Sequence, residues 1–185
     1  MVHEDSARAM LKAATQDCHE RVDAVFSQAM LSDRRSYTRF LAAQAAAQLP
    51  VEAALIAGGV ADIVPDWPLR ERGALLRQDL ADLDCAVPPP AGALAFNSAA
   101  EVLGGLYVLE GSRLGGQVLK RSVPEHFPAR FLGGVNSAAW RSLLATLDTA
   151  LTTAPLRDAA IASARSVFAL FEASGRQHLS LVTAP

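Results

Sequence analysis

The stretch NSAAEVLGGLYVLEGSRLGGQVLKR, residues 97–121, is the most informative part of the chain. Ser98 is followed three residues later by Glu101, a capping box that marks the start of a helix ahead of an apolar run. Near the other end, Lys120 places positive charge where the helix dipole favours it, and Pro124 follows shortly after. These signals predict one long helix.

Five glycines lie inside this helix: Gly104, Gly105, Gly111, Gly115 and Gly116. Each costs roughly 1 kcal/mol relative to alanine in a helix interior. Gly104, Gly111 and Gly115 are spaced by seven and four residues, so they leave the backbone bare along one face. Either another helix packs closely through this groove of small residues, or a flat ligand lies across it, with the paired glycines permitting a bend.

The composition favours one all-α domain. The chain has 185 residues, a usual length for a single domain, and is 51% hydrophobic but only 6% aromatic. Such an alanine- and leucine-rich composition favours helices over strands. We therefore expect one domain over residues 1–185, with a frayed tail at 180–185.

The net charge bears on the partners of the protein, and the cysteines bear on its location. The formal net charge of -2 gives no electrostatic reason to expect nucleic acid or an anionic membrane surface. Cys18 and Cys85 occur without an N-terminal signal peptide, and no apolar run approaches the roughly 20 residues that span a bilayer. We expect a soluble cytoplasmic protein that binds neither nucleic acid nor membrane.

Hydrophobic periodicity and cap signals predict the remaining helices. They are expected over residues 6–26, 33–56 with a kink or break at Pro50, 69–83, 137–151 and 155–179. In the first of these, His19 lies at the edge of the apolar stripe, one turn from Asp23. Taken alone, such a histidine is more often a half-buried surface residue than a ligand.

Two familiar types of site are absent from the sequence pattern. The glycines of residues 111–116 have the spacing of a phosphate loop, but Gln117-Val118 replaces the Lys-Ser/Thr pair that such a loop needs. Cys18 and Cys85 lack the spacing of a zinc site, so we interpret both as small hydrophobic residues.

Two segments together resemble the heme oxygenase family, particularly its bacterial members, including those associated with phytochromes. Residues 11–19 read LKAATQDCH and are similar to the family's proximal helix, L-K-x-A-T-x-x-x-H, whose His is the axial ligand of the heme iron. Residues 111–120 read GSRLGGQVLK and are similar to its distal helix, G-D-L-S-G-G-Q-V-L-K. The resemblance covers nearly the whole chain. It implies an all-α fold in which heme is sandwiched between a proximal and a kinked distal helix.

The same resemblance implies an activity, with heme as both cofactor and substrate. The family uses O2 and electrons from a donor such as a ferredoxin or a reductase to open heme at a meso carbon. Biliverdin, CO and ferrous iron are released. The likeness to phytochrome-associated members implies a phytochrome as a recipient of the biliverdin.

The resemblance also implies the residues of the site. His19 would bind the iron, while Gly111, Gly115 and Gly116 would let the distal helix lie almost on the porphyrin. An exposed porphyrin edge needs cations for its propionates. Lys12 lies at the family's position for such a cation, and the further candidates are Arg113, Lys120 and Arg141.

One position departs from the family pattern. Ser112 stands where many members have an Asp that holds distal water molecules, so it joins the three distal glycines as a candidate catalytic residue. Serine can hold a water but cannot carry a negative charge at working pH. Glu110 or Gln117 could assist, although we expect Glu110 to be an ordinary exterior residue of the helix.

Two alternatives to a heme oxygenase stay open at this stage. A heme carrier or sensor would bind through His19 without oxidising the heme, because it lacks the distal Asp. A helical enzyme acting on another small molecule, such as a thiamine-type substrate, would use the glycines only for packing.

Overall fold

The structure, a computed structural model, describes residues 6–134 and 136–179, and all regular elements in this part of the chain are helical. In chain order they are α1 (Ala7–Phe26), α2 (Arg34–Ala57), α3 (Val60–Ile63), the 3-10 turn η1 (Trp67–Leu69), α4 (Gly73–Asp82), α5 (Ala99–Lys120), α6 (Ser137–Ala150) and α7 (Ala154–Leu179). The prediction of an all-α fold is confirmed. The tail predicted to fray, residues 180–185, lies outside the described residues.

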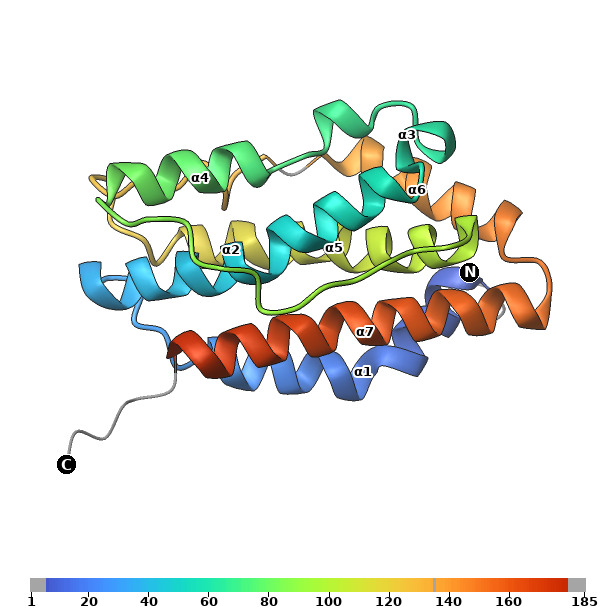
Figure 1. The fold of residues 1–185 in the computed structure, drawn as a ribbon, viewed down its shortest axis with the longest axis horizontal. Helices are drawn as coiled ribbons and strands as arrows, with labels where there is room; N and C mark the ends of the chain where they lie inside the picture. Colours follow the sequence, from blue (N-terminus) through green and yellow to red (C-terminus); the bar gives the residue numbers. More distant parts are fainter. Residues whose placement is uncertain (1–5, 135, 180–185) are drawn as a thin grey trace.

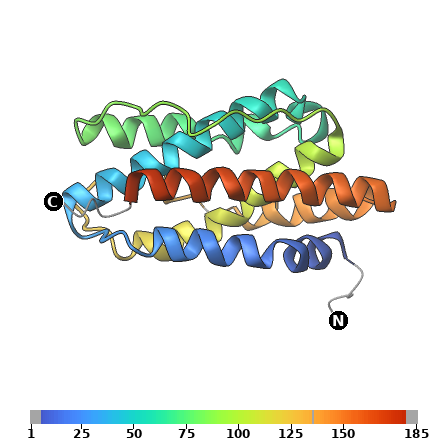
Figure 2. The same cartoon turned by 60° about the horizontal axis from the view of Figure 1, so that its bottom comes forward.

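The last helix, α7, is the centre of the packing. It lies against α1 and crosses α2 and α5, so these three helices make their most extensive contacts with α7 (Figures 1 and 2). The main hydrophobic core lies at these contacts and includes Leu11, Leu103, Leu106 and Val167. Because α1 and α5 both rest on the same rigid element, α7 fixes their relative positions.

Local capping signals set most helix starts. The Ser98 hydroxyl accepts a hydrogen bond from the Glu101 amide at 3.3 Å, and the Glu101 carboxylate accepts one from the Asn97 amide at 2.7 Å. The Asp33 and Asn136 side chains cap α2 and α6 in the same way. The starts of α2, α5 and α6 therefore agree with the sequence prediction.

Two predicted elements differ from the observed ones. Of the two expectations at Pro50, a break is wrong, because α2 continues through this residue, and a kink stays a prediction. The helix expected over residues 69–83 begins only at Gly73. Its N-terminus is capped from another element: the Glu52 carboxylate of α2 accepts hydrogen bonds from the amides of Arg72 at 2.9 Å and Gly73 at 3.0 Å. A cap supplied from 20 residues away leaves no local sequence signal.

Helix α2 also corrects an expectation about apolar runs. By length and composition it could cross a membrane, contrary to the sequence estimate. However, 67% of its most apolar window is buried inside the protein, as in the core helix of a globular fold. This burial makes α2 weak evidence for a membrane span.

Candidate functional site

The five glycines of α5 meet different neighbours. At Gly104, an added Cβ would collide with the Ala160 carbonyl and the Ser163 hydroxyl of α7. At Gly105, it would lie 2.6 Å from the Phe96 ring. Both glycines are buried, and they allow close packing of neighbouring groups on the first half of the helix.

The second half of α5 is open on the same face. A Cβ added at Gly115 would meet no atom within 4 Å, and Gly111 would only touch Trp140 at 3.8 Å. Leu114 and Val118 of the same helix are 46% and 61% exposed. The bare backbone and these side chains form an exposed apolar surface. Gly116 lies on the other side of the helix, 3.7 Å from Leu132.

His19 presents its imidazole from α1. The side chain is 59% exposed, and its Nδ1 lies 3.0 Å from the Asp23 carboxylate one turn later. The Phe168 ring of α7 contacts it edge to face, with 5.9 Å between the ring centroids. Because the carboxylate occupies Nδ1, it orients the ring and leaves Nε2 as the nitrogen that can bind a metal.

Ion pairs fix the part of α1 that carries His19. The Asp17 carboxylate binds Arg165 of α7 at 2.9 Å and Arg21 at 2.9 Å. Arg165 also donates to the Ala14 carbonyl at 2.6 Å. The hydrogen bonds from Arg165 and Arg21 hold the pKa of Asp17 well below its usual range.

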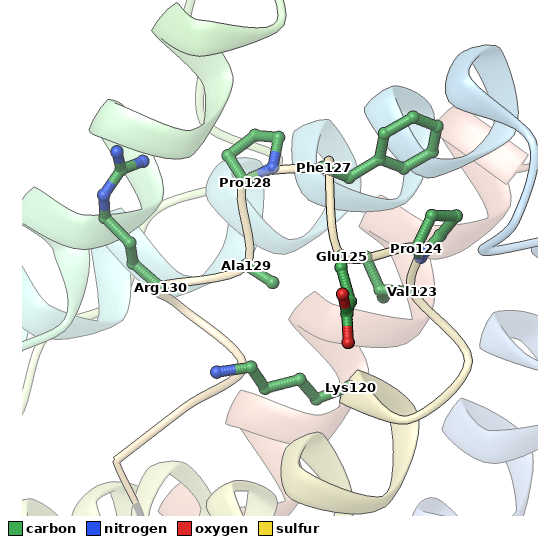
Figure 3. Close-up of a pocket in the computed structure, with 8 residues that line it drawn as sticks. All are labelled: Lys120, Val123, Pro124, Glu125, Phe127, Pro128, Ala129 and Arg130. Carbon is green, nitrogen blue, oxygen red and sulfur yellow. The ribbon is translucent and has the colours of Figure 1, made fainter.

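The four predicted propionate partners lie in different environments. Lys12, Lys120 and Arg141 are exposed, on α1, α5 and α6 respectively. Lys120 lines an open pocket formed with residues 123–130, where Glu125 lies near it and Arg130 points away toward α4 (Figure 3). Arg113, in contrast, is only 8% exposed.

Arg113 belongs to a buried ion cluster behind α5. It lies 3.0 Å from the Glu110 carboxylate, which also faces Arg70 at 3.6 Å. Burial raises the pKa of Glu110, and the guanidinium groups of Arg113, Arg70 and Arg72 oppose this effect. The expectation that Glu110 is an exterior residue is wrong. The Arg113 guanidinium is engaged with Glu110 and with the carbonyl of Arg70, so it does not face an exposed edge.

Ser112 has a partner that the sequence did not indicate. The Arg72 guanidinium donates to the Ser112 hydroxyl at 3.1 Å, and Ser112 donates to the Leu109 carbonyl at 2.7 Å. Arg72 is only 5% exposed. Burial and the nearby charge of Arg113 lower its pKa to about 10. In the sequence it is one of several charged residues in the helix expected over residues 69–83, so no pattern distinguished it.

Comparisons with known proteins indicate the family of this chain. The heme oxygenase family profile matches residues 5–176. A heme oxygenase of Xanthomonas campestris is 40% identical over 116 residues, which cover 57% of this chain and 67% of that protein. The heme oxygenase PigA of Pseudomonas aeruginosa is 34% identical over 149 residues, which cover 75% of each chain.

Solved structures show the same fold. The NO- and CO-bound heme oxygenase of Neisseria meningitidis superposes with a TM-score of 0.82 at 25% identity, covering 98% of this chain and 96% of that one. The heme oxygenase of Leptospira interrogans gives a TM-score of 0.71 at 19% identity, covering 93% and 99%. The family match spans nearly all of the sequence, and the relatives and the fold agree with it. The chain therefore belongs to the heme oxygenase family.

Proposed function

We propose that this protein is a heme oxygenase that binds heme between α1 and the open half of α5 and converts it to biliverdin, CO and ferrous iron. The observation that carries the site assignment is the pairing of an oriented, exposed imidazole at His19 with a bare backbone at Gly115. Both groups lie on helices that rest on α7. Heme, once bound, supplies the iron that activates O2 and the ring that is cleaved.

His19 is the proposed iron ligand. Its Nδ1 is held by Asp23, which fixes the ring orientation and makes Nε2 a better donor. The Phe168 ring supports the imidazole from the side of α7. A single imidazole ligand would leave the iron able to bind O2.

The open half of α5 is the proposed distal wall. Gly111 and Gly115 let its backbone approach a flat ring, while Leu114 and Val118 offer the apolar contact that a porphyrin face requires. Gly116 has no side chain on the side of α5 that faces Leu132. Ser112 holds a water through its hydroxyl oxygen, in place of the family's Asp.

Exposed cations and an external reductant complete the proposal. Lys12, Lys120 and Arg141 are the proposed partners of the propionates, because their side chains are exposed, whereas Arg113 is excluded by its buried ion pair. Electrons come from a ferredoxin or a reductase. A cytoplasmic location and a phytochrome that receives the biliverdin remain predictions.

Turnover of the purified protein tests this function. With ferric heme, an electron donor and air, we expect the Soret absorption to disappear, biliverdin absorption to appear, and chromatography to identify a single bilin isomer. His19→Ala should change the ferric spectrum and abolish turnover. Arg141→Ala, which leaves the iron ligand in place, should retain the wild-type ferric spectrum.

A heme carrier or sensor is the second candidate, and Ser112 in place of Asp is the observation that favours it. It predicts a stable heme complex that survives the electron donor without forming a bilin. If His19→Ala left the ferric spectrum unchanged, both heme functions would lose their basis at this residue.

A further inference from the structure

Helix α7 holds α1 through ion pairs that lie on both sides of His19 in the sequence. Two residues before His19, the Asp17 carboxylate accepts hydrogen bonds from both terminal nitrogens of Arg165, at 2.9 and 3.0 Å. Two residues after it, the Arg21 guanidinium donates to the Glu172 carboxylate at 3.0 Å. Arg21 also donates to Asp17 at 2.9 Å, so the two bridges form one continuous cluster. We call these four charged residues the α1–α7 clasp.

The clasp and His19 lie on opposite flanks of α1. Successive residues of an α-helix are rotated by about 100° around its axis, so positions two residues apart point to nearly opposite sides. Asp17 and Arg21 are both two residues from His19, and the buried face of α1, which includes Cys18, lies between the two flanks. On the His19 flank, the Phe168 ring of α7 contacts the imidazole edge to face. Because α7 contacts α1 on both flanks, it opposes rotation of α1 around its own axis.

Other contacts oppose sliding of α1 along α7. Arg165 donates to the Ala14 carbonyl at 2.6 Å, in addition to its ion pair. Near the end of α1, Gly175 of α7 lies so close to Val25 that an added Cβ would approach it to 2.6 Å. The two bridges of the clasp join residues that are 148 and 151 positions apart in the chain. The helices therefore run parallel in one register, and a slip by one turn would break both bridges.

We propose that Arg165 is a positioning residue for the iron ligand: through Asp17 and the Ala14 carbonyl, it fixes the rotation and the register of α1, and so the direction in which His19 presents its Nε2. Asp23 orients the imidazole relative to α1, whereas Arg165 orients α1 relative to the rest of the fold. A binding group is precisely placed only when its supporting elements are held as well. The inference rests on the proposed function for the role of His19, but the position of the imidazole can be measured without heme.

The first experiment measures this position in the ligand-free protein. NMR of the wild type should show nuclear Overhauser effects between the His19 and Phe168 rings, whose centroids are 5.9 Å apart. Arg165→Met keeps an apolar stem but removes the charge and the donors, so it should weaken these signals. The matched control is Arg157→Met, because Arg157 is also an exposed arginine of α7 but binds the Leu151 carbonyl. Equal weakening in both variants, or no weakening in Arg165→Met, would overturn the proposal.

The second experiment measures the iron–imidazole bond in the ferrous heme complex. Resonance Raman spectroscopy gives the iron–histidine stretching frequency, which depends on the strength and orientation of this bond. Arg165→Met should shift and broaden the band, whereas Arg157→Met should leave it at the wild-type position. In an Asp17→Asn background, Arg165→Met should cause a smaller shift, because residues in contact act as a unit. Equal shifts in the two backgrounds would refute an action of Arg165 through Asp17.

Two further measurements separate this inference from a loss of folding and from the proposed function. Arg165→Lys keeps a charge that can bind Asp17 but loses the fork geometry, so it should recover only part of both wild-type signals. An exposed ion pair contributes little to stability, so Arg165→Met should change the equilibrium constant of unfolding in urea by at most about fivefold. A larger change would assign Arg165 to stability and overturn the proposal. A wild-type protein that binds heme through His19 but forms no biliverdin would refute the proposed function, while the NMR and Raman results on Arg165 would still stand.

Discussion

At the scale of single residues, the glycines of α5 show how one residue type serves two purposes. At Gly104, the Ala160 carbonyl and the Ser163 hydroxyl of α7 occupy the space where a Cβ would lie. Gly115 lies on the same helical face, four residues beyond Gly111, yet has no atom within 4 Å of an added Cβ. Helix packing therefore explains the need for glycine at position 104 but not at position 115.

This difference predicts opposite effects of two alanine substitutions. Gly104→Ala should lower the free energy of unfolding by about 1 to 3 kcal/mol, because the methyl group overpacks the α5–α7 contact. Gly115→Ala should raise it by up to about 1 kcal/mol, because alanine favours the helix and meets no neighbour. Urea denaturation of the ligand-free proteins measures both values. A stable Gly104→Ala variant would contradict the packing.

Heme titration of Gly115→Leu extends the comparison to binding. The larger side chain should leave the ligand-free fold intact but reduce heme affinity, since it occupies the surface that the porphyrin would cover. Undiminished affinity would show that heme binds elsewhere.

At the scale of elements, the pairing of α1 with α7 should depend on pH. Asp17 joins the two helices through Arg165, and its pKa is lowered from 3.8. A carboxylate whose pKa is lower in the folded than in the unfolded chain stabilises the folded state at any pH above its unfolded-state pKa. This contribution is lost as the pH falls from the unfolded-state pKa toward the folded-state pKa. Asp17→Asn should therefore melt at a lower temperature than the wild type at pH 7.

The same linkage predicts that the difference between the two proteins shrinks as the pH falls below about 4. Thermal unfolding followed by circular dichroism at several pH values measures it. A melting-temperature difference that stays constant down to pH 2 would show that charge on Asp17 is not the cause.

The attachment of η1 to α5 depends on the buried ion cluster. Glu110 faces both Arg113 and Arg70, and all three side chains are more than nine-tenths buried. Glu110→Gln removes the negative charge that faces both buried guanidinium groups; Arg70 keeps its ion pair with Asp66, whereas Arg113 loses its carboxylate. Breaking a buried pair in this way should cost about 3 to 5 kcal/mol of unfolding free energy.

A surface carboxylate provides the control for Glu110→Gln. Asp82 binds Arg130 at 2.6 Å but is 49% exposed, so Asp82→Asn should cost at most about 1 kcal/mol. Equal losses in chemical denaturation for the two variants would argue against a special role of burial at Glu110.

At the scale of the whole molecule, ligand binding and folding should be linked. The proposed site has walls on two helices that meet through α7, so a bound porphyrin would join them directly and stabilise only the folded chain. At a ligand concentration of 100 times Kd, this linkage contributes about 2.7 kcal/mol.

Thermal unfolding with two porphyrins separates the contributions of ring and iron. In the wild type, ferric heme should raise the melting temperature more than iron-free protoporphyrin does, because only the iron can bind His19. In His19→Ala the two porphyrins should act alike. Equal stabilisation of the wild type by both would exclude His19 as the iron ligand.

The sequence by itself determined the helical class, the starts of α2, α5 and α6, and the family. Helix periodicity and caps such as Ser98 with Glu101 depend on residues within one or two turns, so they can be read locally. The pairing of the His19 segment with the glycine-rich segment led to the family for the same reason, since each motif is continuous in the chain.

Only the tertiary structure decided which neighbours these residues meet. The glycine face of α5 is covered by α7 at Gly104 and is open at Gly115. Glu110 and Arg113 are buried. Helix α4 begins at a cap supplied by Glu52, and Arg72 contacts Ser112. Each outcome depends on contacts between segments that are distant in sequence. A local pattern specifies which face of a helix needs a partner, but only the packing of the other helices specifies what that partner is.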